Sequence, residues 1–306
     1  MFLDINAYDI NMQPAVEYLN ENYEYCYLES MHYINSCRDI TTIITGLSYG
    51  LDGLESKLFT GNTINLSMHS QDLYYDYQHI KKAVKNSKNS IKQCIITLGY
   101  YSLFYDLSRS SNSWKCMWTY MPLFSDTHNA DTNGMEIPVI KEEYEKFYRS
   151  FFQENQSFYG RAILREHTTP KVAQRGGWIC LDVAERDKVA FELAQKHNKH
   201  LVHIDTFNEN KAILRDMINF LVENNIRPII TILPVSKEYL KYIDCSYKEI
   251  LLNVLDEISC NMNIDFVDMN DLDFFTESDI LDSDHLNYNG ALKATVLLDG
   301  VINNLF

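Results

Sequence analysis

"ITTIITGLSYG", residues 40–50, carries the first indication of the fold. Its first half is apolar and β-branched without alternating polar positions, which is typical of a strand buried on both faces of a parallel sheet. Its second half places Ser48 between Gly46 and Gly50, and both residue types favour tight turns. Because ligands of an open parallel sheet bind at the carboxyl ends of its strands, the stretch predicts a strand whose end presents a serine hydroxyl.

Four further runs share this apolar, β-branched character, at residues 63–66, 93–98, 228–233 and 264–267. Segments with helical periodicity separate most of the runs, and another such segment closes the chain. Strands that alternate with helices indicate βαβ crossovers and a parallel sheet covered on both faces. The sequence therefore predicts an α/β protein with five parallel strands.

A long segment, roughly residues 105–208, separates the third run from the fourth. A structureless loop of that length is implausible within a compact domain. We therefore expect a helical insertion that forms a cap over one edge of the sheet. Residues 1–38 are also expected to be helical, and the whole chain, residues 1–306, is expected to be a single domain.

The composition argues against several classes of protein. The net charge of −15 disfavours binding to nucleic acid or to an anionic membrane, because phosphate binding needs a dense basic patch. No segment approaches the roughly 18 to 20 apolar residues that span a bilayer. The start of the chain lacks the features of a signal peptide, and the seven cysteines include no C-x-x-C pair. These features predict a cytoplasmic protein with reduced thiols.

No cofactor or metal site is expected. The Gly176-Gly177 pair lacks the spacing of a phosphate-binding loop or a dinucleotide fingerprint. The acidic residues are scattered and show no metal-ligand constellation. We therefore predict neither a bound cofactor nor a metal ion.

The strongest chemical motif lies near the C-terminus, where "LDSDHLNYNG" spans residues 281–290. Asp282 and His285 are three residues apart, so one turn can point the carboxylate at Nδ1 of the imidazole while Nε2 faces outward. A serine hydroxyl becomes a good nucleophile when such a base removes its proton. Asp284 is a second candidate for orienting the imidazole, but an adjacent residue usually points elsewhere. Asp282 is therefore preferred.

Four short blocks in this chain resemble, in type and order, those of the SGNH (GDSL-like) hydrolases. The first block of that family, Gly-Asp-Ser, appears as "GLS", residues 46–48, with Leu47 in place of aspartate. The second, Asn-x-x-x-x-Gly, appears as "NLSMHS", residues 65–70, with Ser70 in place of glycine. His69 in this loop is interpreted as solvent-facing, although a role in substrate binding stays open.

The other two blocks differ in how well they are preserved. Gly-x-Asn-Asp appears as "GYYS", residues 99–102, so Tyr101 stands where the family has asparagine. Asp-x-x-His-Leu is intact as "DSDHL", residues 282–286. The resemblance covers roughly residues 39–105 and 226–306 but not the long insertion. It implies a three-layer α/β/α sandwich with a flavodoxin-like sheet and an insertion between strands three and four.

The resemblance also implies roles for individual residues. Ser48 would attack an acyl carbonyl, His285 would move the proton, and Asp282 would hold the imidazole. Backbone N–H groups of Ser48 and Ser70 would bind the oxyanion, where one donor is typically worth about 3 to 4 kcal/mol of barrier. Without the asparagine, either the Tyr101 hydroxyl joins them or the site has backbone donors only.

Gly99 and Tyr100 complete the expected substrate-binding edge, since they lie at the end of the third strand. Tyrosine rings at that edge offer both a face and a hydroxyl to a sugar, although packing in the core is the alternative. Both Tyr100 and Tyr101 are therefore candidates for substrate contact.

The sequence predicts a serine-dependent acyl-ester hydrolase or O-acyltransferase, most plausibly for acetyl groups on a carbohydrate or a cell-surface glycan precursor. Acetyl-CoA would fit as a co-substrate, although no motif for it is visible. One alternative is a thioesterase or lipid esterase. The other is an inactive relative that serves as a binding or scaffold protein in polysaccharide assembly.

Overall fold

The computed structural model describes residues 34–35, 39–132, 177–260 and 264–303. The chain divides into two compact units, one formed by residues 38–105 and 170–306 and the other by residues 1–37 and 106–169. Apart from residues 34 and 35, which are helical, the predicted N-terminal helical segment lies outside the described residues, as does the middle of the predicted cap. The single-domain organisation stays a prediction.

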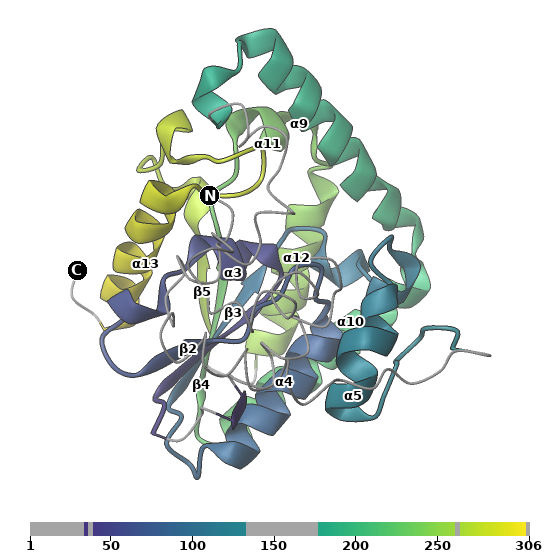
Figure 1. Cartoon of the computed structure of the whole chain (residues 1–306), viewed down its shortest axis with the longest axis vertical. Coiled ribbons are helices and arrows are strands. Elements are labelled where there is room, and N and C mark those ends of the chain that lie inside the picture. The colour runs from purple at the N-terminus through teal and green to yellow at the C-terminus, as the bar shows by residue number, and fades with distance from the viewer. Residues whose placement is uncertain (1–33, 36–38, 133–176, 261–263, 304–306) are drawn as a thin grey trace, which may run out of the picture. The chain divides into compact units, whose positions relative to one another are not determined.

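A five-stranded parallel sheet forms the centre of the larger unit (Figure 1). Its strands are β1 (Thr42–Gly46), β2 (Thr63–Asn65), β3 (Gln93–Leu98), β4 (Arg227–Ile232) and β5 (Asp265–Asp268). Their order is β2-β1-β3-β4-β5, and every neighbouring pair is parallel. This is the flavodoxin-like order, in which the switch point lies between β1 and β3. The predicted five-stranded parallel sheet is confirmed.

Helices cover both faces of the sheet (Figure 1). On one side lie α4 (Leu73–Asn86), α10 (Ile204–Glu223) and α12 (Ser246–Ser259). On the other side α3 (Ser48–Gly53) packs against α13 (Tyr288–Ile302). The central strands β1, β3 and β4 are buried along almost their whole length, which explains their lack of polar alternation. The three-layer α/β/α architecture is confirmed.

The described part of the insertion in this unit is helical. After β3 comes η3 (Ser102–Phe104), and before α10 come η7 (Trp178–Cys180), α9 (Val183–Asn198) and η8 (Lys199–Val202). Helix α9 packs on α11 (Lys237–Tyr242), which follows β4. Short 3₁₀ turns complete the unit at η2 (Ser56–Leu58), η9 (Met269–Asp271) and η10 (Glu277–Asp279).

The described part of the smaller unit consists of short helical turns. They are η4 (Leu107–Arg109), the π-helix η5 (Cys116–Tyr120) and α5 (Met121–Phe124). The π-helix runs directly into α5, which ends at Ser125 in the left-handed conformation. Asp106 starts this stretch by accepting a hydrogen bond from the Ser108 backbone N–H at 2.8 Å.

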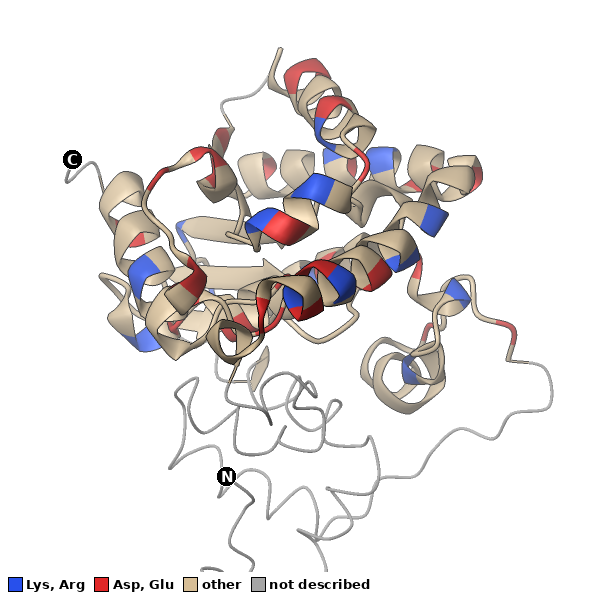
Figure 2. Cartoon of the chain, turned by 90° about the horizontal axis from the view of Figure 1, so that it is seen from above, with Lys and Arg blue, Asp and Glu red and all other residues tan. Residues whose placement is uncertain are grey.

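Acidic and basic residues are interspersed along the helices (Figure 2). No helix within the described ranges has the length and apolar character needed to cross a bilayer. The five cysteines in these ranges are all free thiols: Cys94, Cys116, Cys180, Cys245 and Cys260.

Candidate active site

The turn after β1 is shaped by glycine. Gly46 ends the strand with a φ of 137°, a conformation that side chains rarely adopt. A Cβ built on Gly46 would lie 2.2 Å from the backbone oxygen of Thr97 on β3, and one on Gly50 would lie 2.6 Å from Oγ of Ser67. The two glycines therefore allow the turn to pack closely against Thr97 and Ser67. Ser48 begins α3 directly after this turn.

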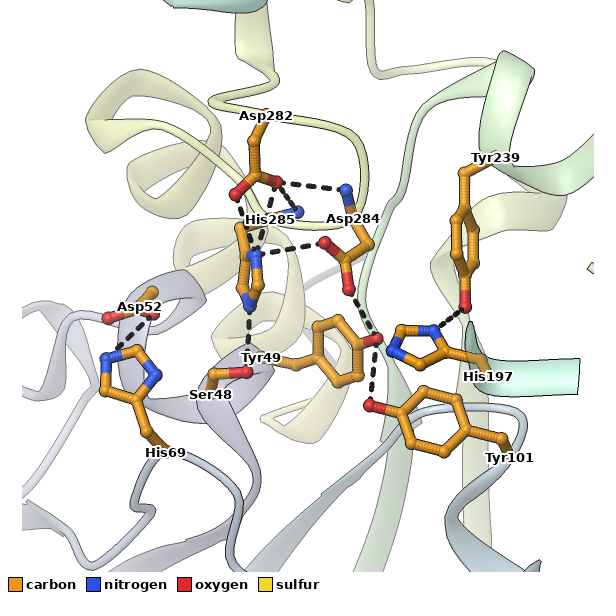
Figure 3. A network of polar contacts seen from close by, with 10 residues as sticks. All are labelled: Ser48, Tyr49, Asp52, His69, Tyr101, His197, Tyr239, Asp282, Asp284 and His285. Atoms are coloured by element: carbon orange, nitrogen blue, oxygen red, sulfur yellow. Dashed lines mark hydrogen bonds and ion pairs between the residues drawn. The ribbon is translucent and has the colours of Figure 1, made fainter. Parts of the chain in front are cut away.

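Ser48, His285 and Asp282 form a hydrogen-bonded chain (Figure 3). Nε2 of His285 lies 2.8 Å from Oγ of Ser48. On the other side of the ring, Nδ1 lies 3.1 Å and 3.2 Å from the two carboxylate oxygens of Asp282. Ser48 and His285 are partly exposed, whereas Asp282 is buried. The structure thus brings together the three residues that the sequence singled out.

A tight loop holds the histidine in place. One carboxylate oxygen of Asp282 accepts hydrogen bonds from the backbone N–H groups of Asp284 at 3.1 Å and His285 at 2.9 Å. The loop closes on itself where the Leu281 N–H donates to the His285 carbonyl at 2.9 Å. Asp282 therefore shapes the backbone that carries His285 as well as contacting its ring.

Asp284 contacts the same histidine nitrogen. Its Oδ1 lies 3.1 Å from Nδ1 of His285, and its Oδ2 accepts a hydrogen bond from the Tyr49 hydroxyl at 2.9 Å. The Tyr49 ring stacks on the imidazole with 5.4 Å between the ring centroids. Sequence spacing favoured Asp282 alone, because adjacent side chains usually diverge. Here the loop turns tightly enough for both carboxylates to reach one nitrogen.

These contacts set the charges of the site. Burial by itself lowers the pKa of His285, but the negative charges of Asp284 and Asp282, with their hydrogen bonds, raise it well above its ordinary value of 6.5. Burial by itself raises the pKa of Asp284, but His285 outweighs burial and holds that pKa well below 3.8. Each group therefore favours the charged form of the other.

Tyr101 lies within a buried group of aromatic side chains (Figure 3). Its hydroxyl lies 3.5 Å from the Tyr49 hydroxyl, and its ring stacks on His197 with a centroid distance of 4.1 Å. His197 in turn lies 2.5 Å from the Tyr239 hydroxyl through Nδ1. The described contacts of the Tyr101 hydroxyl thus join it to Tyr49 rather than to Ser48.

His197 was not singled out by the sequence. It lies in the last turn of α9, within the insertion, and burial lowers its pKa to about 4. No local motif marks it. The packing of α9 on α11 brings it to Tyr239, and its ring stacks on Tyr101 after β3.

Tyr100 and Gly99 contact other groups. The Tyr100 hydroxyl donates to Asp268 at 2.7 Å, and Lys248 lies 5.8 Å from the centre of its ring. A Cβ on Gly99 would lie 2.6 Å from the Tyr49 ring, so the glycine makes room for that ring. In this arrangement Tyr100 is buried and bound to Asp268, while Gly99 determines where Tyr49 sits.

The loop after β2 lies beside the Ser48 turn. The Met68 N–H donates to the Gly46 carbonyl at 3.1 Å, which places Ser70 two residues further along. Ser70 has a φ of 58°, and its carbonyl accepts from the Tyr105 hydroxyl at 3.2 Å. His69 in the same loop lies 3.7 Å from Asp52 of α3. The second block of the sequence thus runs along the turn that carries the serine.

The carboxylates also raise the question of a metal ion. Asp282, Asp284 and His285 each bring one atom within 4.8 Å of the others, an approach that is found in metal sites as well. The histidine nitrogen involved is Nδ1, and a proton on that nitrogen accounts for its approach to both carboxylates. The absence of a metal and of a cofactor stays a prediction.

The structure of this chain is similar to several solved structures. Three of the 15 similar chains are a protein classed as an acylhydrolase from Bacteroides fragilis, a GDSL-like lipase from Bacteroides thetaiotaomicron and a protein classed as a platelet activating factor from Streptococcus pneumonia. Their sequence identities are 12%, 10% and 11%, and their TM-scores are 0.39, 0.43 and 0.43. The similarity covers 87%, 92% and 97% of this chain and 87%, 100% and 99% of theirs.

The comparisons with sequences are less informative. A protein-family model matches residues 179–306, which is less than half of the chain, and its description names no family or activity. No curated protein matches the chain. The fold therefore rests on the strand order and pairing described above, and the chemistry rests on the geometry of the site.

Proposed function

We propose that this chain is a serine-dependent acyl-ester hydrolase or O-acyltransferase. The observation that carries the proposal is the 2.8 Å contact between Oγ of Ser48 and Nε2 of His285, with Asp282 at the other ring nitrogen. This is the arrangement in which a base activates a hydroxyl and a carboxylate orients the base. The partial exposure of Ser48 and His285 leaves this contact open to an ester.

The chemistry needs two displacements. The Ser48 hydroxyl gives its proton to Nε2 of His285 while Oγ forms a bond to the acyl carbon. The bond from that carbon to the leaving alcohol then breaks, and the alcohol takes the proton from His285. Water or an acceptor hydroxyl next gives a proton to His285 while its oxygen forms a bond to the acyl carbon. The bond from that carbon to Oγ then breaks, and Ser48 takes the proton back from His285. Hydrolysis and transfer differ only in this acceptor.

The oxyanion of each tetrahedral intermediate needs donors. We assign them to the backbone N–H groups of Ser48 and Ser70, with the loop after β2 held beside the serine turn by the Met68 to Gly46 hydrogen bond. Tyr101 does not reach Ser48 through any described contact, so a backbone-only site is the form that we propose. Each such donor typically lowers the barrier by about 3 to 4 kcal/mol.

The finer part of the proposal concerns the substrate. We propose a small acyl group, such as acetyl, on a hydroxyl of a carbohydrate or a cell-surface glycan precursor, with acetyl-CoA as a candidate donor for transfer. This part depends on the resemblance described above and on its departures at Leu47, Ser70 and Tyr101. A thioesterase or lipid esterase uses the same acyl-enzyme and is separated from it by the acyl chain it accepts.

One observation favours a second candidate, an inactive binding or scaffold protein in polysaccharide assembly. The residue at the asparagine position, Tyr101, is buried and joined to Tyr49 and His197. A relative that kept the sheet but lost its side-chain oxyanion donor would have this feature. The hydrogen-bonded Ser48 argues for the enzyme instead.

Labelling with a fluorophosphonate probe, followed by intact mass, tests the proposal. We expect one adduct on the wild-type chain and none on Ser48→Ala, with labelling reduced at least about a hundredfold in His285→Ala because the hydroxyl loses its base. Circular dichroism of each variant shows whether it is folded. Turnover of an acetyl ester such as 4-nitrophenyl acetate should follow the same order.

The result also separates the candidates. If the folded wild-type chain neither reacts with the probe nor turns over the ester, the enzyme proposal fails and the binding protein takes its place. If both reactions occur, added sugar acceptors distinguish transfer from hydrolysis by the appearance of an O-acetyl product. EDTA in parallel assays tests the prediction that no metal takes part.

A further inference from the structure

One histidine nitrogen faces two carboxylates, which is one more than a catalytic imidazole needs. Nδ1 of His285 lies 3.1 Å from Asp282 and 3.1 Å from Asp284, and it can offer only one hydrogen. Both aspartates are buried, with 7% of the Asp282 residue surface and 4% of the Asp284 residue surface exposed. Two negatively charged carboxylates that lie this close together and away from solvent need a positive charge between them.

The surroundings supply little other positive charge. On the loop of His285 the facing groups are Asp282 and Asp284, and on α3 they are the hydroxyls of Ser48 and Tyr49. Across the described part of the chain, the ion pairs of both aspartates are made with His285 alone.

The more distant groups add no cation near neutral pH. Tyr101 and Tyr239 have pKa values raised by burial, so they are uncharged hydroxyls. His197 on α9 has a pKa lowered by burial to about 4, so it is neutral. Among the described groups that contact the two carboxylates, the proton on His285 is therefore the positive charge that remains.

We propose that Asp284, oriented by the Tyr49 hydroxyl, is a second positioning residue that, together with Asp282, keeps His285 protonated near neutral pH when no substrate is bound. The inference rests on the proposed function of Ser48 and His285 and concerns the regulation of that site. A protonated imidazole donates to Oγ of Ser48 instead of accepting from it. The Ser48 hydroxyl can then be activated only after the imidazole has lost its proton to solvent.

The geometry explains why Asp284 stays charged in this role. The Tyr49 hydroxyl donates to its Oδ2, which leaves Oδ1 directed at Nδ1. The Tyr49 ring stacks on the imidazole, and Gly99 makes room for that ring. Tyr49 thus holds the carboxylate and the ring against each other.

NMR of the free protein tests the proposal without relying on activity. In protein labelled with ¹⁵N-histidine, the His285 signals are assigned by their loss in His285→Gln. We expect His285 to be protonated at pH 7.5 in the wild type. In Asp284→Asn its titration should move about one to three pH units lower. An Asp273→Asn variant, which removes one exposed charge nearby in sequence, should leave the titration unchanged.

The pH dependence of ester turnover gives the second readout. The rate of the wild type should rise only above neutral pH, whereas the rise for Asp284→Asn should occur at lower pH and reach a lower plateau because its base is weaker. The two profiles should therefore cross. Asp282→Asn should show the same shift but a much lower plateau, since Asp282 also holds the loop backbone.

These outcomes keep the two proposals apart. A neutral His285 at pH 7.5, or an unchanged titration in Asp284→Asn, overturns the role of Asp284 even if the enzyme is active. A protonated His285 in a chain that turns over no ester supports the role of Asp284 while the enzyme proposal fails. If the pH–rate profiles of the wild type and Asp284→Asn have the same midpoint and differ only in maximal rate, the role proposed for Asp284 is also overturned.

Discussion

Asp76 and Asp284 both carry buried carboxylates, yet their surroundings give them opposite charge preferences. Asp76, on α4, accepts hydrogen bonds at 2.6 Å from Oγ1 of Thr45 and at 2.6 Å from Nε2 of Gln71. Among the described residues, Asp76 forms no ion pair, and its Oδ2 atom accepts no hydrogen bond. Burial raises the pKa of Asp76 from 3.8 to about 7. Asp284 has the histidine that Asp76 lacks.

This difference predicts a pH-dependent stability. A carboxyl group whose pKa is higher in the folded than in the unfolded protein destabilises the fold as pH rises from about 4 to about 7, where the unfolded chain ionises first. Three pKa units correspond to about 4 kcal/mol at most. Asp76→Asn stays uncharged, so its free energy of unfolding relative to the wild type should increase between pH 5 and pH 8.

Urea denaturation at the two pH values measures this effect, with Asp273→Asn as an exposed control that should show no such trend. A stability difference between Asp76→Asn and the wild type that is the same at pH 5 and pH 8 would contradict the prediction. Gln71 connects Asp76 to the turn that carries Ser48, because its amide also donates to the Gly46 carbonyl at 3.4 Å.

At the scale of elements, the junction of β1 with α3 determines where the serine is presented. Gly46 ends β1 and pairs with Thr97 of β3, whose Oγ1 donates to the Thr45 carbonyl at 3.0 Å. The loop after β2 joins the same point through the Met68 N–H. Three segments of the sheet therefore meet at one turn, and that turn can tolerate no side chain at Gly46.

Gly46→Ala is expected to disrupt this junction. Its Cβ would lie 2.2 Å from the Thr97 backbone oxygen, and its φ of 137° strains any side chain. The combined cost should be about 3 kcal/mol or more. The matched control is Gly53→Ala at the end of α3, where the one close contact of the Cβ would be the flexible end of Leu233 at 2.5 Å.

Thermal and urea denaturation of the two alanine variants compare these costs directly. We expect Gly53→Ala to lose about 1 kcal/mol, because the Leu233 side chain can move. Labelling by the fluorophosphonate probe should fall in any Gly46→Ala protein that folds, since the serine turn shifts. Equal stability losses for the two variants would show that the close approach at Gly46 is relieved elsewhere.

At the scale of the whole molecule, the charge decides which partners are favoured. The chain carries 42 acidic residues against 27 lysines and arginines, and both kinds are interspersed along the helices (Figure 2). Several of the basic side chains are paired, as Arg186 is with Glu277 and Lys211 is with Glu257. A polyanion would therefore meet net repulsion from this protein.

We accordingly expect no binding to nucleic acid. The fluorescence anisotropy of a labelled 20-nucleotide single strand and of the matching duplex should stay constant up to about 10 μM protein at 50 mM salt, where nonspecific binders are strongest. An anisotropy increase that declines steeply with added salt would contradict this expectation and reveal a local basic surface.

The sequence alone determined the sheet and the three residues at its edge. Apolar runs without polar alternation mark buried parallel strands, and the structure places β1 to β5 within two residues of them. Carboxyl ends of parallel strands share one edge, so Ser48 after β1 and the loop of Asp282 and His285 after β5 could be expected to meet there. Both inferences use only local patterns and chain order.

The tertiary structure decided the surroundings of those residues. It turned Tyr100 toward Asp268, joined Tyr101 to Tyr49 and brought His197 to Tyr101 from a helix of the insertion. It also directed Asp284 at the histidine that the spacing had assigned to Asp282. Side-chain directions of this kind depend on packing between segments far apart in the chain and on the exact turn of one loop, and no local period or spacing in the sequence encodes them.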